Sequence, residues 1–98
     1  MRLNVERKVL DDLEKLPPKD WGLIRSKLRE FEKTGRGDVR KIRDGLFRLR
    51  IGRWRIFYWR EENEVYILKI LPREVAYRLD IIDEMIRRID RLKAGKKG

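Results

Sequence analysis

The sequence contains no histidine, no cysteine and no glutamine, and it has a single serine and a single threonine among 98 residues. Without histidine, a Ser-His triad, a histidine acid–base pair and a histidine-ligated metal site are impossible. Without cysteine, disulfides and thiolate chemistry are excluded as well. Any reaction must therefore use arginine, lysine, tyrosine, carboxylates or backbone groups. We expect no metal, no cofactor and no small-molecule ligand.

Long apolar runs are also missing. None approaches the roughly 20 residues that a membrane-spanning helix needs. The N-terminal stretch MRLNVERKVLDDLEKL is charged throughout, unlike a signal peptide. We therefore expect a cytoplasmic protein without a membrane partner. The length suits one small domain, which we place at residues 1–93, followed by a flexible basic tail at residues 94–98.

Charge is abundant and unevenly distributed. Charged residues make up 45% of the chain and the net charge is +10. Many charges of both signs and the lack of glutamine are typical of heat-adapted proteins. That adaptation does not explain the excess, because residues 36–60 alone carry a net charge of +7. A basic patch on one element predicts a polyanionic partner, first a nucleic acid and second an acidic protein.

Apolar periodicity predicts an α+β domain with the element order β-α-α-β-β-β-α. The N-terminal half begins with a short edge strand and continues with two amphipathic helices. Pro17 and Pro18 separate these helices, and Gly35 is suited to the position after the second one. The predicted bounds are residues 2–5 for the strand and residues 7–16 and 18–33 for the helices. We interpret residues 35–45, with three glycines, as a loop.

The C-terminal half predicts an antiparallel meander and a last helix. LFRLRI alternates strictly, with Phe47, Leu49 and Ile51 on one side and Arg48 and Arg50 on the other. Gly52-Arg53 is typical of a type II′ hairpin turn. Residues 54–60 form the return strand, the apolar residues 65–71 are expected in the middle of the sheet, and Asp80 caps a helix that begins there. We expect the helices to pack on one face of this small antiparallel sheet.

The helical hairpin, FRLRIGRWRIFY and LKILPREVAYR together resemble the RelE/ParE superfamily of toxins from toxin–antitoxin modules, and archaeal RelE proteins most of all. The resemblance covers roughly residues 2–78. It implies a RelE-like fold and a ribosome-dependent, metal-independent endoribonuclease, or mRNA interferase. Such a toxin inhibits translation in the stress response by cutting mRNA in the ribosomal A site. It also implies 2′-OH attack that leaves a 2′,3′-cyclic phosphate, and a RelB-like antitoxin partner.

Matching the family pattern implies five catalytic positions: Arg48, Arg50, Arg55, Arg73 and Tyr77. Arginine suits the role, because its planar fork donates two hydrogen bonds to phosphate. Tyrosine is a poor base near neutral pH unless nearby guanidinium groups stabilise its phenolate. We hypothesise that Tyr77 assists deprotonation of the 2′-OH and that Arg73 stabilises the transition state or leaving group. The further predicted RNA contacts are Arg40, Lys41, Arg43, Arg53, Lys69 and Arg78.

Other interpretations remain open on the sequence. Alternating arginines on a strand can serve only solubility and edge protection, and Tyr77 can be an ordinary tyrosine at the edge of the core. Trp54, Phe57, Tyr58 and Trp59 can stack on bases, although alternation places two of them in the core. The chain can be a ParE-like toxin acting on DNA gyrase, although ParE-type proteins generally lack the five catalytic positions. It can also be a non-catalytic RNA-binding domain or a degenerate toxin.

Overall fold

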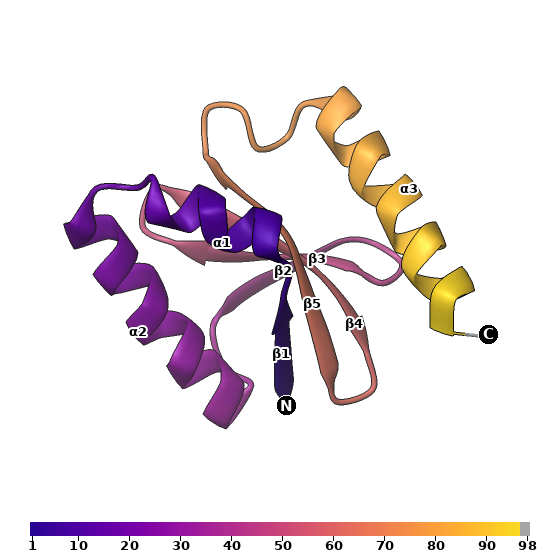
Figure 1. Ribbon diagram of the computed structural model, residues 1–98, viewed down its shortest axis with the longest axis horizontal. Coiled ribbons are helices and arrows are strands. Elements are labelled where there is room, and N and C mark those ends of the chain that lie inside the picture. The colour runs from indigo at the N-terminus through magenta and orange to yellow at the C-terminus, as the bar shows by residue number, and fades with distance from the viewer. Residues whose placement is uncertain (97–98) are drawn as a thin grey trace.

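The computed structural model describes residues 1–96, which fold into a five-stranded sheet with helices on both faces (Figure 1). The spatial order of the strands is β1-β5-β4-β3-β2, so β4 is the central strand. In chain order the elements are β1 (Arg2–Val5), α1 (Arg7–Glu14), α2 (Pro18–Thr34), β2 (Asp38–Arg43), β3 (Leu46–Ile51), β4 (Trp54–Glu61), β5 (Glu64–Pro72) and α3 (Leu79–Lys96).

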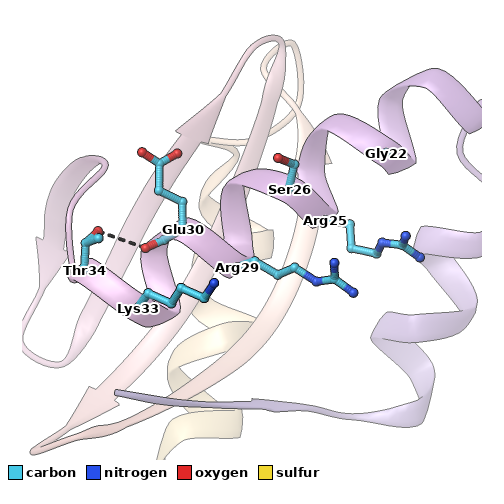
Figure 2. A pocket seen from close by; sticks show the side chains of 7 residues that line it. All are labelled: Gly22, Arg25, Ser26, Arg29, Glu30, Lys33 and Thr34. Atoms are coloured by element: carbon cyan, nitrogen blue, oxygen red, sulfur yellow. Dashed lines mark hydrogen bonds between the residues drawn. The ribbon is translucent and has the colours of Figure 1, made fainter.

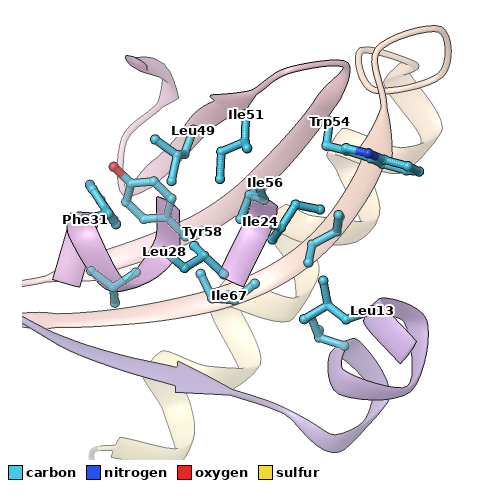
Figure 3. Close-up of a cluster of buried hydrophobic side chains, with 13 residues drawn as sticks. Leu13, Ile24, Leu28, Phe31, Leu49, Ile51, Trp54, Ile56, Tyr58 and Ile67 are labelled. Carbon is cyan, nitrogen blue, oxygen red and sulfur yellow. The ribbon is translucent and has the colours of Figure 1, made fainter. Parts of the chain in front are cut away.

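The predicted helical hairpin is confirmed. Pro18 opens α2 at a position whose backbone N–H would have no helical partner, and Gly35 ends it with a φ of 70°, which a side chain would resist. Both helices lie on one face of the sheet (Figure 1). Their apolar sides bury Val9, Leu13, Ile24, Leu28 and Phe31 against β3, β4 and β5 (Figure 3). The two helices therefore cover one face of the sheet and do not cover the opposite face.

The expectation that all helices pack on one face is wrong. α3 crosses the opposite face (Figure 1), where Ile82, Met85 and Ile89 pack against Phe57 and Trp59 of β4. The loop after β5 leads the chain to that face (Figure 1). Arg88 fastens α3 there, since its guanidinium donates to the Leu68 carbonyl oxygen at 2.5 Å and reaches Glu6 Oε2 at 2.5 Å.

The segment interpreted as a loop contains a strand, β2. It pairs antiparallel with β3 as an edge strand, and all of its residues but one are exposed. Its charged, glycine-flanked sequence lacks apolar alternation because neither face of an edge strand needs to be fully covered. Gly45, with a φ of 79°, closes the turn to β3. The sheet therefore has one more strand than predicted.

Strand positions also differ in the middle of the sheet. β5 is paired on both sides, but β4 takes the central place that we expected for β5. β1 pairs with β5 in parallel, so the sheet is mixed rather than wholly antiparallel. The hairpin turn is as predicted, with a positive φ of 58° at Gly52. We expected two of the four aromatic residues of β4 in the core. Because both faces of β4 are covered, all four are buried there: Trp54, Phe57, Tyr58 and Trp59.

The last helix begins at Leu79, one residue before the predicted cap, so Asp80 lies in its first turn and pairs with Arg78 at 3.3 Å. The helix continues to Lys96. The predicted flexible tail at residues 94–98 is therefore helical at residues 94–96, and its last two positions lie outside the described residues. None of the helices in residues 1–96 combines the length and apolar character needed to cross a bilayer.

Candidate RNA-binding site

Strand register brings the basic residues into two adjacent rows on the face of the sheet that α3 partly covers. Residues that pair across strands point to the same side. One row joins Arg40 of β2, Arg48 of β3, Phe57 of β4 and Lys69 of β5. The next row joins Asp38, Arg50, Arg55 and Leu71 in the same strand order. We call Arg40, Arg48, Arg50 and Arg55 the arginine cluster.

Two members of the arginine cluster are buried. Arg48 is 7% exposed and Arg55 is 9% exposed. Arg55 Nη1 donates to the carbonyl oxygens of Gly52 at 2.9 Å and of Trp54 at 3.2 Å, which holds the side chain beside the hairpin turn. The Nε atoms of Arg48 and Arg55 have no hydrogen-bond partner among residues 1–96. A buried guanidinium with an unused donor is costly, and the two positive charges favour an anion close to this face of the sheet.

Asp38 is the acidic member of the second row, and sequence reasoning missed it. Its Oδ2 lies 2.6 Å from Arg50 Nε, and its Oδ1 lies 3.7 Å from Arg48 Nη2. The sequence predicts a loop at residues 35–45, and a loop residue has no expected position relative to the arginines. Only a strand assignment at residues 38–43 would place Asp38 opposite Arg50.

Tyr77 reaches the arginine cluster from the loop that follows β5. Its ring meets Phe57 edge-on, with centroids 6.1 Å apart, while Ala76 beside it is fully buried. Because Phe57 is the cross-strand partner of Arg48, Tyr77 and Arg48 are neighbours of the same ring. Tyr77 is 44% exposed and lines an open hollow with Arg40, Lys41 and Ile42. The tyrosine therefore stands at the rim of the basic face.

Arg73 lies near the tip of the β3–β4 hairpin. Its backbone N–H donates to the Arg53 carbonyl oxygen at 2.9 Å. Glu74 lies between the two side chains, 3.6 Å from Arg73 Nε and 3.7 Å from Arg53 Nη2. Arg53 also lies over the Trp54 ring at 5.0 Å from its centroid. The Arg73 side chain is thus paired with Glu74 at the hairpin tip.

The remaining predicted RNA contacts surround this face. Arg40, Lys41 and Arg43 are exposed on the edge strand, and Lys41 Nζ lies 3.0 Å from Asp44. Lys69 lies against α3, 3.7 Å from Glu84, and Arg78 pairs with Asp80. Edge-strand cations are accessible to a polyanion, whereas Lys69 is held beside the helix.

A further open hollow lies on the outer side of α2, away from the arginine cluster (Figure 2). Its basic side chains, Arg25, Arg29 and Lys33, come from successive turns of the helix, and Thr34 Oγ1 donates to the Glu30 carbonyl oxygen at 2.8 Å. It contains no nucleophile next to a base, so we place no chemistry there. Within residues 1–96, no three His, Cys, Asp or Glu side chains gather in a way that would hold a metal ion.

Known structures share this architecture. A chain of the RelE-RelB complex from the archaeon Pyrococcus horikoshii OT3 aligns with a TM-score of 0.64 and 24% identity, over 74% of this chain and 93% of that one. The RelB-RelE complex of Methanococcus jannaschii gives a TM-score of 0.62 and 19% identity over the same shares. Isolated RelE toxin from E. coli gives 0.56 and 19%, over 89% of this chain and 96% of that one.

The sequence matches no protein-family model and no curated protein. The structural likeness confirms the RelE-like fold that the sequence predicted.

Proposed function

We propose that this chain is the toxin of a toxin–antitoxin pair, an endoribonuclease that cleaves mRNA in the A site of the ribosome and is blocked by a RelB-like antitoxin. The RelE-like fold supports the toxin assignment. The observation that carries the catalytic part is the strand register, which puts Arg48, Arg50 and Arg55 on one face of the sheet. A phosphate group is a suitable ligand for several guanidinium groups that share a face.

In the proposed reaction the 2′-oxygen of a nucleotide attacks its own 3′-phosphate. A bond forms between the 2′-oxygen and phosphorus, and the bond from phosphorus to the 5′-oxygen of the next nucleotide breaks. The products are a 2′,3′-cyclic phosphate and a 5′-hydroxyl. Negative charge grows on the phosphate oxygens along this path, and preplaced cations that bind it more tightly than the ground state accelerate the reaction. Arg48, Arg50 and Arg55 fill this role.

Two residues outside the cluster handle the protons and the leaving oxygen. Tyr77, at the rim beside Phe57, assists removal of the 2′-OH proton. Arg73, after releasing Glu74, stabilises the negative charge on the 5′-oxygen as it leaves, and a solvent water donates the proton that completes the 5′-hydroxyl. That release is easy, because the Arg73 side chain is 68% exposed and exposed ion pairs contribute only about 0–1 kcal/mol.

The mRNA and ribosome contacts extend over the edge strand. Arg40, Lys41 and Arg43 are exposed along β2 and continue the basic surface away from the cluster. Phosphate contacts of this kind position an RNA chain without reading its sequence. The RelB-like antitoxin is proposed because chains with this fold occur in RelE-RelB complexes.

The test is to add the purified chain to translating ribosomes and to map mRNA 3′ ends. Cuts phased with codons, which disappear when an antitoxin encoded by a neighbouring small acidic gene is added, are expected. A supercoiling assay with DNA gyrase runs in parallel. Inhibited supercoiling without RNA cleavage would assign the ParE-like activity instead, and RNA binding with neither effect would leave a binding domain.

A further inference from the structure

We propose that Asp38 is a resident counter-ion of the arginine cluster, which takes the place of an RNA phosphate in the free protein and must give way when RNA binds. This inference rests on the proposed function, because it concerns the same site and the same ligand. It adds a residue that competes with the substrate.

The contacts of Asp38 resemble those of a bound phosphate. One carboxylate oxygen lies 2.6 Å from Arg50 Nε and the other lies 3.7 Å from Arg48 Nη2, so the group spans two arginines of β3. Carboxylate and phosphate both present oxygens that a guanidinium fork recognises. The two anions therefore need the same donors, and both cannot hold them fully at once.

The location of Asp38 makes the exchange feasible. It is the first residue of the edge strand β2, its side chain is 45% exposed, and its main partner Arg50 is 55% exposed. An ion pair this accessible contributes little net stability. A phosphate that also contacts Arg55 can replace it without disturbing the core.

The contact also has a purpose in the free protein. Arg40, Arg48, Arg50 and Arg55 occupy adjacent positions of two rows, and their like charges repel one another. Asp38 offsets that repulsion and orients Arg48 and Arg50. Because Asp38 neutralises part of the charge of the arginine cluster, the cluster has a lower affinity for an anion that makes only one contact with it.

The test compares wild type with Asp38→Asn for binding of a single-stranded DNA oligonucleotide, which lacks the attacking 2′-OH and is not cleaved. Fluorescence anisotropy at several KCl concentrations measures Kd. Asn keeps an oxygen that can accept from Arg50 but carries no charge. We expect Asp38→Asn to bind at least about fivefold more tightly at low salt, since one opposing charge is removed from contact distance.

The salt dependence gives a second readout, which a purely structural role would not change. A freed Asp38 attracts a cation and so offsets part of the counter-ion release from the nucleic acid. Removing it should steepen the slope of log Kd against log salt by up to about 0.7. Asp11→Asn is the matched control: it removes the same charge from an exposed arginine pair on α1, 3.8 Å from Arg7, on the other side of the sheet. Its Kd should stay within about twofold of wild type.

The outcomes separate the two proposals. Equal or weaker binding by Asp38→Asn, with wild type binding normally, overturns the counter-ion role and leaves the proposed function standing. No binding by either protein overturns the counter-ion role, and the ribosome cleavage assay then decides the proposed function separately. Thermal unfolding of Asp38→Asn and of Asp38→Ala confirms that the variants are folded. If the first is unfolded, the alanine variant provides the comparison with the same expected direction.

Discussion

The ring of Tyr77 meets the ring of Phe57 edge-on, with the ring planes at 80°. Phe57 pairs across the strands with Arg48, so one residue of β4 contacts the Tyr77 ring and is also the strand partner of a buried arginine. The contact uses the aromatic ring of Tyr77 and not its hydroxyl group. A phenylalanine would therefore keep the contact and lose only the hydroxyl.

Tyr77→Phe should slow mRNA cleavage at least tenfold, because the substituted ring cannot take part in proton transfer. RNA binding and the melting temperature should change little, since the edge contact with Phe57 is retained. Cleavage assays on translating ribosomes and a thermal melt measure the two effects. A fully active variant would remove Tyr77 from the reaction.

Arg48→Met should make the fold more stable while it weakens RNA binding. The Arg48 side chain is 9% exposed and leaves Nε unpaired, so an apolar side chain of similar size removes the desolvation cost of a buried charge. Asp38 keeps Arg50 as its closer partner at 2.6 Å, so the substitution leaves no carboxylate without a cation. Arg50→Met is the control, because the Arg50 side chain is 55% exposed and its change should stay near ±0.5 kcal/mol. Urea unfolding measures both; a clear loss of stability in Arg48→Met would contradict the account.

Arg88→Ala should destabilise the protein by about 1–3 kcal/mol, because it removes a charged donor from the Leu68 carbonyl oxygen and from Glu6. The neighbouring Arg87 is exposed, so Arg87→Ala serves as the matched control with little expected change. Chemical unfolding monitored by tryptophan fluorescence compares them. Equal effects of the two substitutions would show that Arg88 does not fasten α3.

Alkaline pH should lower stability partly through Tyr58. Burial raises the pKa of the Tyr58 hydroxyl, and the nearby Arg60 charge offsets part of the rise. Between the unfolded pKa near 10 and the higher folded pKa, the native state holds more protons than the unfolded state. The free energy of unfolding is therefore unaffected by this group below about pH 9 and decreases above about pH 10.

Tyr58→Phe removes that titration, so its stability should fall less steeply above pH 10 than that of wild type. Urea midpoints measured between pH 8 and pH 11 compare the two slopes. Parallel curves would mean that Tyr58 does not contribute to the alkaline decline.

Prolines and glycines in the sequence predicted where several helices and turns begin and end. Pro17 and Pro18 separate the two helices, Gly35 ends the second, and Gly52 turns the hairpin, because each position has a backbone requirement that few residues meet. The arginines of β3 were placed together on one face by the period of two along a strand.

Nonlocal packing determined what the sequence did not predict. β2 lacks apolar alternation because it lies at an edge, and its pairing with β3 brings Asp38 opposite Arg50. The burial of Phe57 and Trp59 requires cover on the second face by α3 and by Ala76 of the preceding loop, whereas Trp54 and Tyr58 pack under the helical hairpin. Arg73 follows β5 in a loop, and its side chain pairs with its neighbour Glu74.

The most direct test of the central claim is the chemistry of RNA ends produced on translating ribosomes. Wild type should generate codon-phased mRNA fragments that carry 2′,3′-cyclic phosphates, and Arg48→Met, although folded, should generate at least about a hundredfold fewer, as for the loss of a major electrostatic contact to the transition state. Intact mRNA with wild type, or equal cleavage by Arg48→Met, would contradict the assignment of the arginine cluster as an RNA-cleaving site.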